Sequence, residues 1–464
     1  MKELLRHGLW IVYLIFFQIF IFAVVIFQVR SPLPSNLEYD VDALRETPIQ
    51  DSYAYLLECR QEALNVRLAL IHQAKTSIAL TSYAIYDGQA RDVLYGALLS
   101  AAERGVTVRL VIDGFIEGRF MSDYQTTTYL MTHPNIEIRF FEPFSIWRPH
   151  AVQNRLHDKL LIIDEQYGII GGRNIGDRYF LDTSNSVAVT YDRDVLIFGR
   201  PSSQAVQDMS MYFNELYNHP FSHREKPSEP SSSSEAVKQN LLEAHEDFIV
   251  AETLDLDSIM NHLHEAAIQT GTITFLRSPL NRMHKKPVIF NTLQQLAGAY
   301  EAFFVQTPYF IADRTMRAHF PNFSDVEVTV LTNSPITNPN LLAVAGYMSV
   351  RQSLAARTTL YEYHARSSIH AKTILMGDDI TVIGSYNIDP RSVSLSTESV
   401  VVIHSVAFQS VVREAIEPLI TSSLHITATE TMNPYEIEII EETRIRRVLR
   451  SVLQYVIRPF DYML

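Results

Sequence analysis

The feature that most constrains this chain is an internal repeat. Residues 157–174 read HDKLLIIDEQYGIIGGRN, and residues 370–387 read HAKTILMGDDITVIGSYN. In both segments a histidine, a lysine, a glycine, a glycine or serine, and an asparagine stand at the same offsets. With average residue usage, such a set arises by chance at roughly one in a million starting points. Two copies in one chain therefore indicate a duplicated structural unit.

The repeated residues suit phosphoryl transfer. His157 and Lys159, like His370 and Lys372, are two positions apart, so on a strand both side chains of each pair point to the same face. If the two halves pack with pseudo-two-fold symmetry, both pairs surround one cavity together with the motif asparagines. One neutral histidine would attack phosphorus and form a phosphohistidine, while the other would donate and accept a proton. The lysines and amides would balance the charge on the phosphoryl oxygens, and the site would need no metal or cofactor.

A histidine of this kind needs an orienting carboxylate. Two candidates stand at the start of apolar runs downstream of the motifs, Asp194 in DRDVLIF and Glu398 in TESVVVI. We expect Asp194 to pair with His157 and Glu398 with His370; the alternative is that both are solvated residues at strand starts. The candidate catalytic residues are His157, Lys159, Asp164, Asn174, Asp194, His370, Lys372, Asn387 and Glu398.

The pattern along the chain is typical of an α/β layer protein. Helical spacing in 56–75 is followed by the strand-like run SIALTSYAI, and a helix ending at Gly105 is followed by VTVRLVIDG. A Ser- and Pro-rich stretch interrupts the pattern before a similar α/β run begins. We therefore expect a first domain at 51–220, a linker at 221–240 and a second domain at 241–440.

The amino-terminal residues predict a membrane anchor. Residues 9–29 read LWIVYLIFFQIFIFAVVIFQV, about the length that crosses a bilayer as a helix. Lys2 and Arg6 precede this run, and the acidic residues Glu38, Asp40 and Asp42 follow it, so the body is expected on the extracytoplasmic side. A cleaved signal peptide is the alternative, although no A-x-A site follows. The anchor segment is taken as residues 1–30.

The carboxyl-terminal segment, 441–464, predicts a basic amphipathic helix. Its apolar residues recur in steps of three and four between 444 and 458, on one helical face. Arg446, Arg447 and Arg450 lie off that stripe. Such a helix could lie on an anionic membrane surface or pack on the body of the protein, and periodicity does not separate these alternatives.

Composition narrows the class of partner. The formal net charge of −13 argues against a nucleic-acid partner, because phosphate binding usually requires a basic face. The single cysteine, Cys59, excludes an intramolecular disulfide bond.

On these motifs the chain resembles the phospholipase D superfamily, whose pattern HxKx4D…G[GS]xN stands in full in the first quoted segment and at all but one position in the second. It is most similar to the bacterial cardiolipin synthase-like branch, on the segments GGRNIGDRYF, VLTNSPITNPNLLAVAGY and GSYNIDPRS and on TPYF at 307–310. The resemblance covers nearly all of residues 51–460. It implies two α/β domains with mixed sheets flanked by helices, a site at their interface, phosphohistidine chemistry and no metal. With the predicted anchor, we expect a single-pass protein of the bacterial inner membrane.

One position departs from the family pattern. The aspartate that should follow Lys372 by five residues is replaced by Gly377, with Asp378 and Asp379 next to it. In the family this aspartate mainly supports the structure around the motif. Asp378 could substitute through a local shift, or the second half could be altered.

The resemblance implies a phosphatidyltransferase that forms cardiolipin from phosphatidylglycerol and a second phospholipid, which could be phosphatidylglycerol or phosphatidylethanolamine. A phospholipase D-type hydrolase that releases phosphatidic acid shares the motif and stays open. A nuclease and an inactive membrane scaffold are further alternatives. The negative charge and the lipid-side features argue against the first, and Gly377 alone favours the second.

Overall fold

The structure is a computed structural model of the chain, and it describes residues 10, 13–14, 17–18, 32, 34–45, 52–117, 124–182, 189–225, 229–312, 316 and 326–457. Most of the predicted anchor, 9–29, lies outside these residues. Among the residues that are described, no helix is both long and apolar enough to span a membrane.

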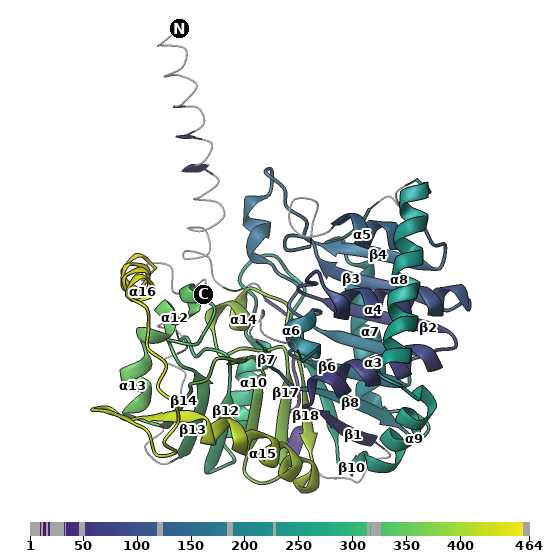
Figure 1. Ribbon diagram of the computed structural model, residues 1–464. Coiled ribbons are helices and arrows are strands. Elements are labelled where there is room, and N and C mark those ends of the chain that lie inside the picture. The colour runs from purple at the N-terminus through teal and green to yellow at the C-terminus, as the bar shows by residue number, and fades with distance from the viewer. Residues whose placement is uncertain are drawn as a thin grey trace.

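The described residues of the first domain form a nine-stranded mixed sheet with helices on both faces (Figure 1). The strand order is β10-β1-β8-β6-β5-β2-β3-β4-β9, in which β2, β3 and β4 are parallel and their neighbours antiparallel. Its strands are β1 (Ser52–Leu57), β2 (Ser77–Ser82), β3 (Thr107–Asp113), β4 (Ile136–Phe141), β5 (Leu160–Ile163), β6 (Tyr167–Gly171), β8 (Asp194–Gly199), β9 (Ser222–Arg224) and β10 (Ile268–Thr270). Its helices are α3 (Arg60–Gln73), α4 (Gln89–Glu103), α5 (Tyr124–Leu130), the 3-10 helix η3 (Pro149–Gln153), α6 (Asp177–Phe180), α7 (Gln204–Asn218), α8 (Ser232–Ala251) and α9 (Leu256–Ala266).

The second domain repeats this order. Its sheet runs β11-β18-β17-β16-β12-β13-β14-β19-β20, so β11 corresponds to β1, β18 to β8, and the remaining strands follow in turn. Its strands are β11 (Ile273–Arg277), β12 (Ala302–Gln306), β13 (Glu327–Asn333), β14 (Thr359–Tyr363), β16 (Thr373–Met376), β17 (Ile380–Gly384), β18 (Ser399–His404), β19 (Ser423–Ile426) and β20 (Thr431–Met432). Its helices are α10 (Val288–Ala297), α12 (Leu341–Met348), α13 (Arg351–Ala355), α14 (Pro390–Ser394), α15 (Val406–Thr421) and α16 (Arg444–Val456), and the 3-10 helix η2 (Ala43–Arg45) precedes both domains. The predicted pair of similar α/β domains is confirmed.

Burial explains why these runs become strands and where the domains join. The residues of β5 and of β17 are all buried, because each sheet is covered on both faces. One apolar cluster fills the outer side of each sheet. A third cluster lies between the sheets and joins side chains of α7, such as Phe213, to side chains of α15 and β18, such as Phe408 and Val401. Helices α7 and α15 are therefore shared between the domains, which fixes the two sheets against each other.

The predicted linker at 221–240 and the predicted domain start at 241 are wrong. Strand β9 pairs with β4, and β10 pairs with β1, so residues 222–270 complete the first domain. The Ser-rich run is a helix start, because Ser231 and Ser234 form a capping box at the beginning of α8. Helix α8 then packs closely on α4, where a Cβ at Gly96 would lie 2.0 Å from the carbonyl oxygen of Leu241. The boundary falls at Gly271, between β10 and β11.

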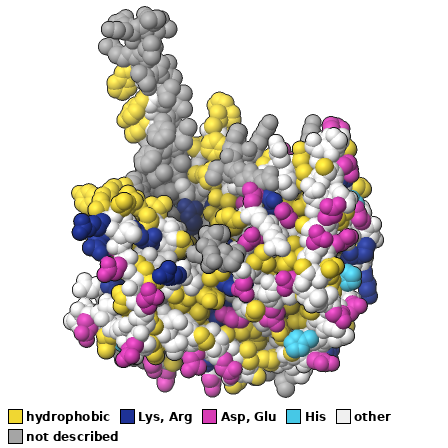
Figure 2. Space-filling model, viewed as in Figure 1, with side chains coloured by type: hydrophobic (Ala, Val, Ile, Leu, Met, Phe, Trp, Pro, Cys, Tyr) yellow, Lys and Arg dark blue, Asp and Glu magenta, His cyan; other side chains and the backbone are white. Residues whose placement is uncertain are grey.

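The predicted carboxyl-terminal helix is present as α16. Its apolar residues Ile445, Val448, Val452 and Val456 are exposed, whereas Leu453 is half-buried and Ile457 is buried, so most of the stripe faces away from the body of the protein. Figure 2 shows these hydrophobic side chains gathered along the outer edge of α16, with basic side chains beside them. Residues 458–464 of the predicted segment lie outside the described residues.

Candidate active site

The two motif histidines line one polar cleft between the domains. The cleft has a volume of about 370 Å³, and both His157 and His370 contribute to its wall. The motif amides Asn174 and Asn387 line it as well, as does Glu398. The meeting of the two motifs at one site, which the repeat predicts, is therefore seen in the geometry.

Two short backbone pairings between the domains hold the histidines in place. On one side the amide of His157 donates to the carbonyl of Thr397 at 3.1 Å. On the other side β7 (Thr190–Tyr191) pairs in parallel with β15 (Ser368–Ile369), and the amide of His370 donates to the carbonyl of Tyr191 at 2.6 Å. Each histidine thus begins its motif on a strand segment that is hydrogen-bonded to the other domain.

The orienting carboxylates are crossed between the domains. The Nδ1 atom of His157 lies 2.9 Å from Oε2 of Glu398, and the Nδ1 atom of His370 lies 2.6 Å from Oδ2 of Asp192. Both predicted pairings, Asp194 with His157 and Glu398 with His370, are therefore wrong. The physical reason is the backbone pairing just described. The amides of the histidines bond the carbonyl groups of Thr397 and Tyr191 in the other domain, and the carboxylates Glu398 and Asp192 are the next residues along the chain.

Asp194 has a different environment. It is fully buried and accepts hydrogen bonds from Arg67 Nη2 at 2.6 Å and Arg173 Nη1 at 3.0 Å. Arg173, adjacent to the motif, is thereby held inside the first domain and does not reach the cleft. The motif glycines make room for the acids, since a Cβ at Gly171 would lie 2.0 Å from a carboxylate oxygen of Asp194, and one at Gly172 would lie 2.2 Å from a carboxylate oxygen of Asp192.

The serine of the second motif takes the place of Gly172. Ser385 donates its hydroxyl to Oε2 of Glu398, and Ser392 donates to Oε1 at 2.7 Å. The carboxylate that faces His157 is thus held by two hydroxyl groups in a fully buried position. This arrangement accounts for the alternation of glycine and serine at one offset of the repeat.

The motif lysines and amides surround the histidines. Lys159 donates to the carbonyl oxygen of His157, and Lys372 Nζ lies 2.9 Å from Nδ1 of His370. Within the described part of the chain, the buried Oδ1 atoms of Asn174 and Asn387 have no hydrogen-bond partner. A buried amide whose polar atom is unsatisfied at a cleft wall is suited to bind a ligand.

Burial and the motif cations lower the pKa values of both histidines, which favours their neutral forms. Burial, together with the positive charges of Lys159 and Lys372, holds the pKa of His157 well below its ordinary value. Burial and Lys372 lower the pKa of His370 to about 4, against the opposing effect of Asp192. A bound phosphodiester anion would offset the cations and favour the protonated form of a histidine.

The charged partners are perturbed as well. Burial lowers the pKa of Lys159 to about 7 and that of Lys372 to about 8. Burial raises the pKa of Glu398 to about 7, although the charge of Lys159 opposes that effect. Burial alone would raise the pKa of Asp192, but the neighbouring His370 and Lys372 outweigh that effect and lower the pKa. Such strongly perturbed groups in a cleft are typical of functional sites.

Asp164, a predicted site residue, does not line the cleft. It follows β5, whose four residues separate it from the cleft by roughly 13 Å of strand. Its carboxylate accepts hydrogen bonds from the backbone amides of Lys75, Thr76 and Ser77 at 2.8 Å each, and so ties the start of β2 to the end of β5. Its environment is that of a structural residue.

Gly377 occupies the equivalent turn in the second domain. Both residues have positive φ, 52° at Asp164 and 56° at Gly377, and both donate a backbone hydrogen bond to the first residue of the neighbouring strand. A Cβ at Gly377 would lie 2.7 Å from Cδ1 of Tyr300, so the tyrosine ring fills the space that an aspartate would need. Asp378 does not replace the motif aspartate, whereas Asp379 bonds His404 Nε2 at 2.7 Å. The departure from the motif is therefore accommodated away from the cleft.

Several cleft residues are not evident from the repeat alone. The rings of Tyr83 and Tyr179 lie edge-on to His157 and His370, with centroids 5.0 Å and 5.6 Å apart. Arg178 and Arg391 also line the cleft, and each stands four residues after its motif asparagine. That shared offset is the signal by which the arginine pair could have been found.

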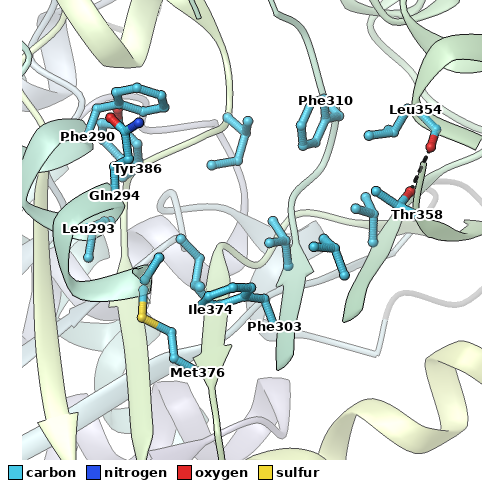
Figure 3. A pocket seen from close by; sticks show the side chains of 15 residues that line it. Phe290, Leu293, Gln294, Phe303, Phe310, Leu354, Thr358, Ile374, Met376 and Tyr386 are labelled. Atoms are coloured by element: carbon cyan, nitrogen blue, oxygen red, sulfur yellow. Dashed lines mark hydrogen bonds between the residues drawn. The ribbon is translucent and has the colours of Figure 1, made fainter. Parts of the chain in front are cut away.

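A second cavity in the second domain is apolar. Figure 3 shows Phe290 and Leu293 of α10 facing Phe303, Ile374 and Met376 of the sheet across this space. It has a volume of about 110 Å³ and contains no titratable group suited to phosphoryl transfer. In the part of the chain that the structure describes, no three His, Cys, Asp or Glu side chains gather in a group that could hold a metal ion.

The fold and the cleft define a duplicated α/β protein whose two histidine–lysine motifs share one site. The sequence matches the family described as "Cardiolipin synthase, PLD-like domain" over residues 68–217 and 292–420, which together make up more than half of the chain. The chain belongs to this family, within the phospholipase D superfamily. It is an enzyme of the phosphatidyltransferase and phosphodiesterase class. Membership of this family implies that the substrates are phospholipids.

The sequence similarity to known proteins covers most of the chain. Cardiolipin synthase C of Escherichia coli K12 is 27% identical over 394 residues, covering 75% of this chain and 80% of that protein. An uncharacterized protein of Helicobacter pylori strain 26695 is 28% identical over 471 residues, covering 89% and 91%. The structure is similar to that of phosphatidylserine synthase from Haemophilus influenzae Rd KW20, with a TM-score of 0.65, 15% identity and coverage of 91% and 98%. At 15% identity, this similarity shows a shared fold and nothing more specific.

Proposed function

We propose that this protein forms cardiolipin by transferring a phosphatidyl group from one phospholipid to the hydroxyl of phosphatidylglycerol. The observation that carries the proposal is the pair of histidines that line one cleft, each with its Nδ1 atom against a buried carboxylate of the other domain. That contact fixes the tautomer and leaves Nε2 as the reactive atom. The name of the E. coli relative supports the choice of product.

In the first step His157 attacks the phosphorus of phosphatidylglycerol through Nε2. A P–N bond forms, the P–O bond to the headgroup glycerol breaks, and protonated His370 gives its proton to the departing oxygen. The phosphatidyl group then stays on His157 as a phosphohistidine. Lys159 and Lys372 stabilise the charge on the non-bridging oxygens, together with the amides of Asn174 and Asn387.

In the second step the hydroxyl of another phosphatidylglycerol attacks the same phosphorus. His370 takes the proton of that hydroxyl, the P–N bond breaks, and the products are cardiolipin and regenerated His157. We assign His370 as the acid and base because Asp192 opposes the fall in its pKa, and His157 as the nucleophile because burial and both lysines hold its pKa low. If water entered instead of the lipid alcohol, the product would be phosphatidic acid.

Mass spectrometry of lipids from a host without its own cardiolipin synthases tests the proposal. Cardiolipin should accumulate with the unaltered chain and be absent with His157→Ala or His370→Ala. Phosphatidic acid without cardiolipin would assign the chain to the hydrolases. An unchanged lipid profile, with the protein present in the membrane fraction, would contradict both assignments.

We also propose that residues 9–29 anchor the chain in the inner membrane with the body on the extracytoplasmic side. The apolar run and the charges on either side of it support this topology. Cys59, the single cysteine, is exposed and provides a native label. A membrane-impermeant maleimide should modify it in intact spheroplasts, with Cys59→Ser as the unlabelled control. Labelling only after lysis would place the body in the cytoplasm.

A further inference from the structure

Helix α16 is attached to the protein through its polar side. Arg446 donates through Nη2 to the carbonyl oxygens of Pro335, at 3.2 Å, and of Asn338. Arg450 forms two hydrogen bonds of 3.0 Å with Glu442, just before the helix. The usual orientation of an amphipathic helix on a protein is therefore largely reversed, because Arg446 and Arg450 face the body and most of the apolar stripe faces outward.

The outward stripe is strongly exposed. The exposed fractions are 76% at Ile445, 63% at Val448, 55% at Val452 and 54% at Val456, with Leu449 at 48%. A single exposed apolar residue is ordinary, but a continuous stripe of them along one helix marks a contact surface. In Figure 2 this stripe forms the hydrophobic outer edge at the end of the molecule that holds α16.

The charge of α16 indicates which partner the stripe meets. The helix RIRRVLRSVLQYV carries four arginines and no acidic residue, in a chain whose net charge is −13. Arg444 and Arg447 are exposed beside the stripe. A basic helix with an apolar face binds in the plane of a bilayer that contains anionic headgroups. A second copy of this acidic chain would offer less complementary charge.

Helix α16 lies next to the wall of the cleft. Helix α16 packs against α12, which supplies Leu342 to the cleft wall, and the segment that leads into α12 supplies Asn338 and Asn340. Arg446 bonds the carbonyl oxygen of that same Asn338, so α16 and the cleft wall are joined directly. Leu342, at this wall of the cleft, is an apolar side chain that is 49% exposed.

We infer that the outward apolar stripe of α16 docks in the headgroup region of an anionic lipid bilayer and thereby sets the mouth of the cleft at the membrane surface. The choice of a lipid partner rests on the proposed function. Because Arg446 holds the helix to the cleft wall, docking fixes the distance between the bilayer and the histidines. The phosphodiester of a lipid would then reach the cleft while its acyl chains stay in the membrane.

A fluorescence measurement on the full chain tests this inference. In a Cys59→Ser, His157→Ala background, a cysteine is placed either at Val452, on the stripe, or at Ser451, on the exposed polar side. Both are exposed positions of the same helix, which makes them matched sites. Each is labelled with an environment-sensitive fluorophore. The protein is then reconstituted in equimolar phosphatidylglycerol and phosphatidylcholine or in phosphatidylcholine alone, with nitroxide-labelled lipid as quencher.

The label at Val452 should be blue-shifted and quenched by nitroxide lipid in the anionic vesicles, and less so in phosphatidylcholine alone, whereas the label at Ser451 should stay water-exposed. A label at Val452 that is unshifted, or shifted without quenching because a second copy covers it, would overturn the inference. Equal quenching at both positions would overturn the assignment to the stripe. Turnover is not needed, since His157 is replaced in every sample, so docking without cardiolipin synthesis in the assay above would separate the two proposals.

Discussion

The Nδ1 atom of His157 lies 2.9 Å from Oε2 of Glu398, although 241 positions separate the two residues along the chain. The reciprocal contact joins His370 to Asp192, so each domain supplies the histidine of one pair and the carboxylate of the other. An orienting carboxylate holds the imidazole tautomer and stabilises the imidazolium form. Both carboxylates are therefore expected to act through their histidine rather than on the lipid.

We expect Glu398→Gln and Asp192→Asn each to lower kcat by about 100-fold or more, with little change in KM, because the imidazole loses its orientation and its counter-charge. The measurement is the steady-state rate of product formation with the purified, folded variants. Glu417→Gln, an exposed change of the same kind on α15, serves as the control. Loss of activity through KM alone would show that the carboxylates contact substrate instead.

Asp194→Asn should behave differently. It removes the charge that Arg67 and Arg173 share in the interior, and leaving a buried cation without its partner costs about 3–5 kcal/mol. We expect a lower midpoint in urea unfolding, with kcat of the folded fraction close to that of the unaltered chain. If kcat fell while the midpoint stayed constant, Asp194 would belong to the reaction itself.

The two motif lysines should give the enzyme an alkaline limit. A lysine is charged only below its pKa, and burial lowers these pKa values to about 7 at Lys159 and about 8 at Lys372. We expect kcat/KM, which reports the ligand-free enzyme, to fall as pH rises through this range. In Lys159→Arg the cation persists, and the fall should shift to higher pH. A profile that stays flat up to the ordinary lysine pKa, about 10.4, would contradict this explanation.

Gly377→Asp should not improve the enzyme, although it restores the family motif. The new side chain would meet the ring of Tyr300 and would also occupy a backbone position with φ of 56°. We expect lower thermal stability and unchanged kcat. A rise in kcat for Gly377→Asp would show that the glycine weakens the second half.

Asp164→Ala changes the counterpart of Gly377 in the first domain. The free energy of unfolding should fall by about 1–3 kcal/mol, because the amides of residues 75–77 lose their acceptor.

The repeat was sufficient to predict the duplicated α/β fold and the meeting of both motifs, because fixed offsets between His, Lys and Asn reflect one strand geometry used twice. The repeat was not sufficient to predict which carboxylate pairs with which histidine. Gly171 pairs with Asp194, whereas the equivalent Gly384 pairs with Val400, so the residue that corresponds to Glu398 is Asp192. Taking the acid nearest the apolar run in each half missed this register, and nothing local in the sequence shows that each histidine meets a carboxylate of the other domain.

The linker was mispredicted for a different reason. Ser and Pro residues are frequent in flexible segments, but Ser also begins helices, and the capping box at Ser231 does so here. The close packing of α8 on α4 at Gly96 depends on contacts between residues far apart in sequence. The orientation of α16 likewise depended on where Arg446 finds its acceptors, which helical periodicity alone does not reveal.

The exchange of carboxylates also sets the order in which reactivity can arise during synthesis. A chain made as far as Gly271 already contains the whole first sheet and also the residues His157, Lys159 and Asp192. The carboxylate that orients His157 and the carbonyl of Thr397 that holds its backbone are made more than a hundred residues later. Because domains generally fold as units from the amino terminus, the first domain is completed as an inert half. The site is therefore complete only after both sheets have closed on α7 and α15, and under the proposed mechanism His157 becomes a competent nucleophile only then.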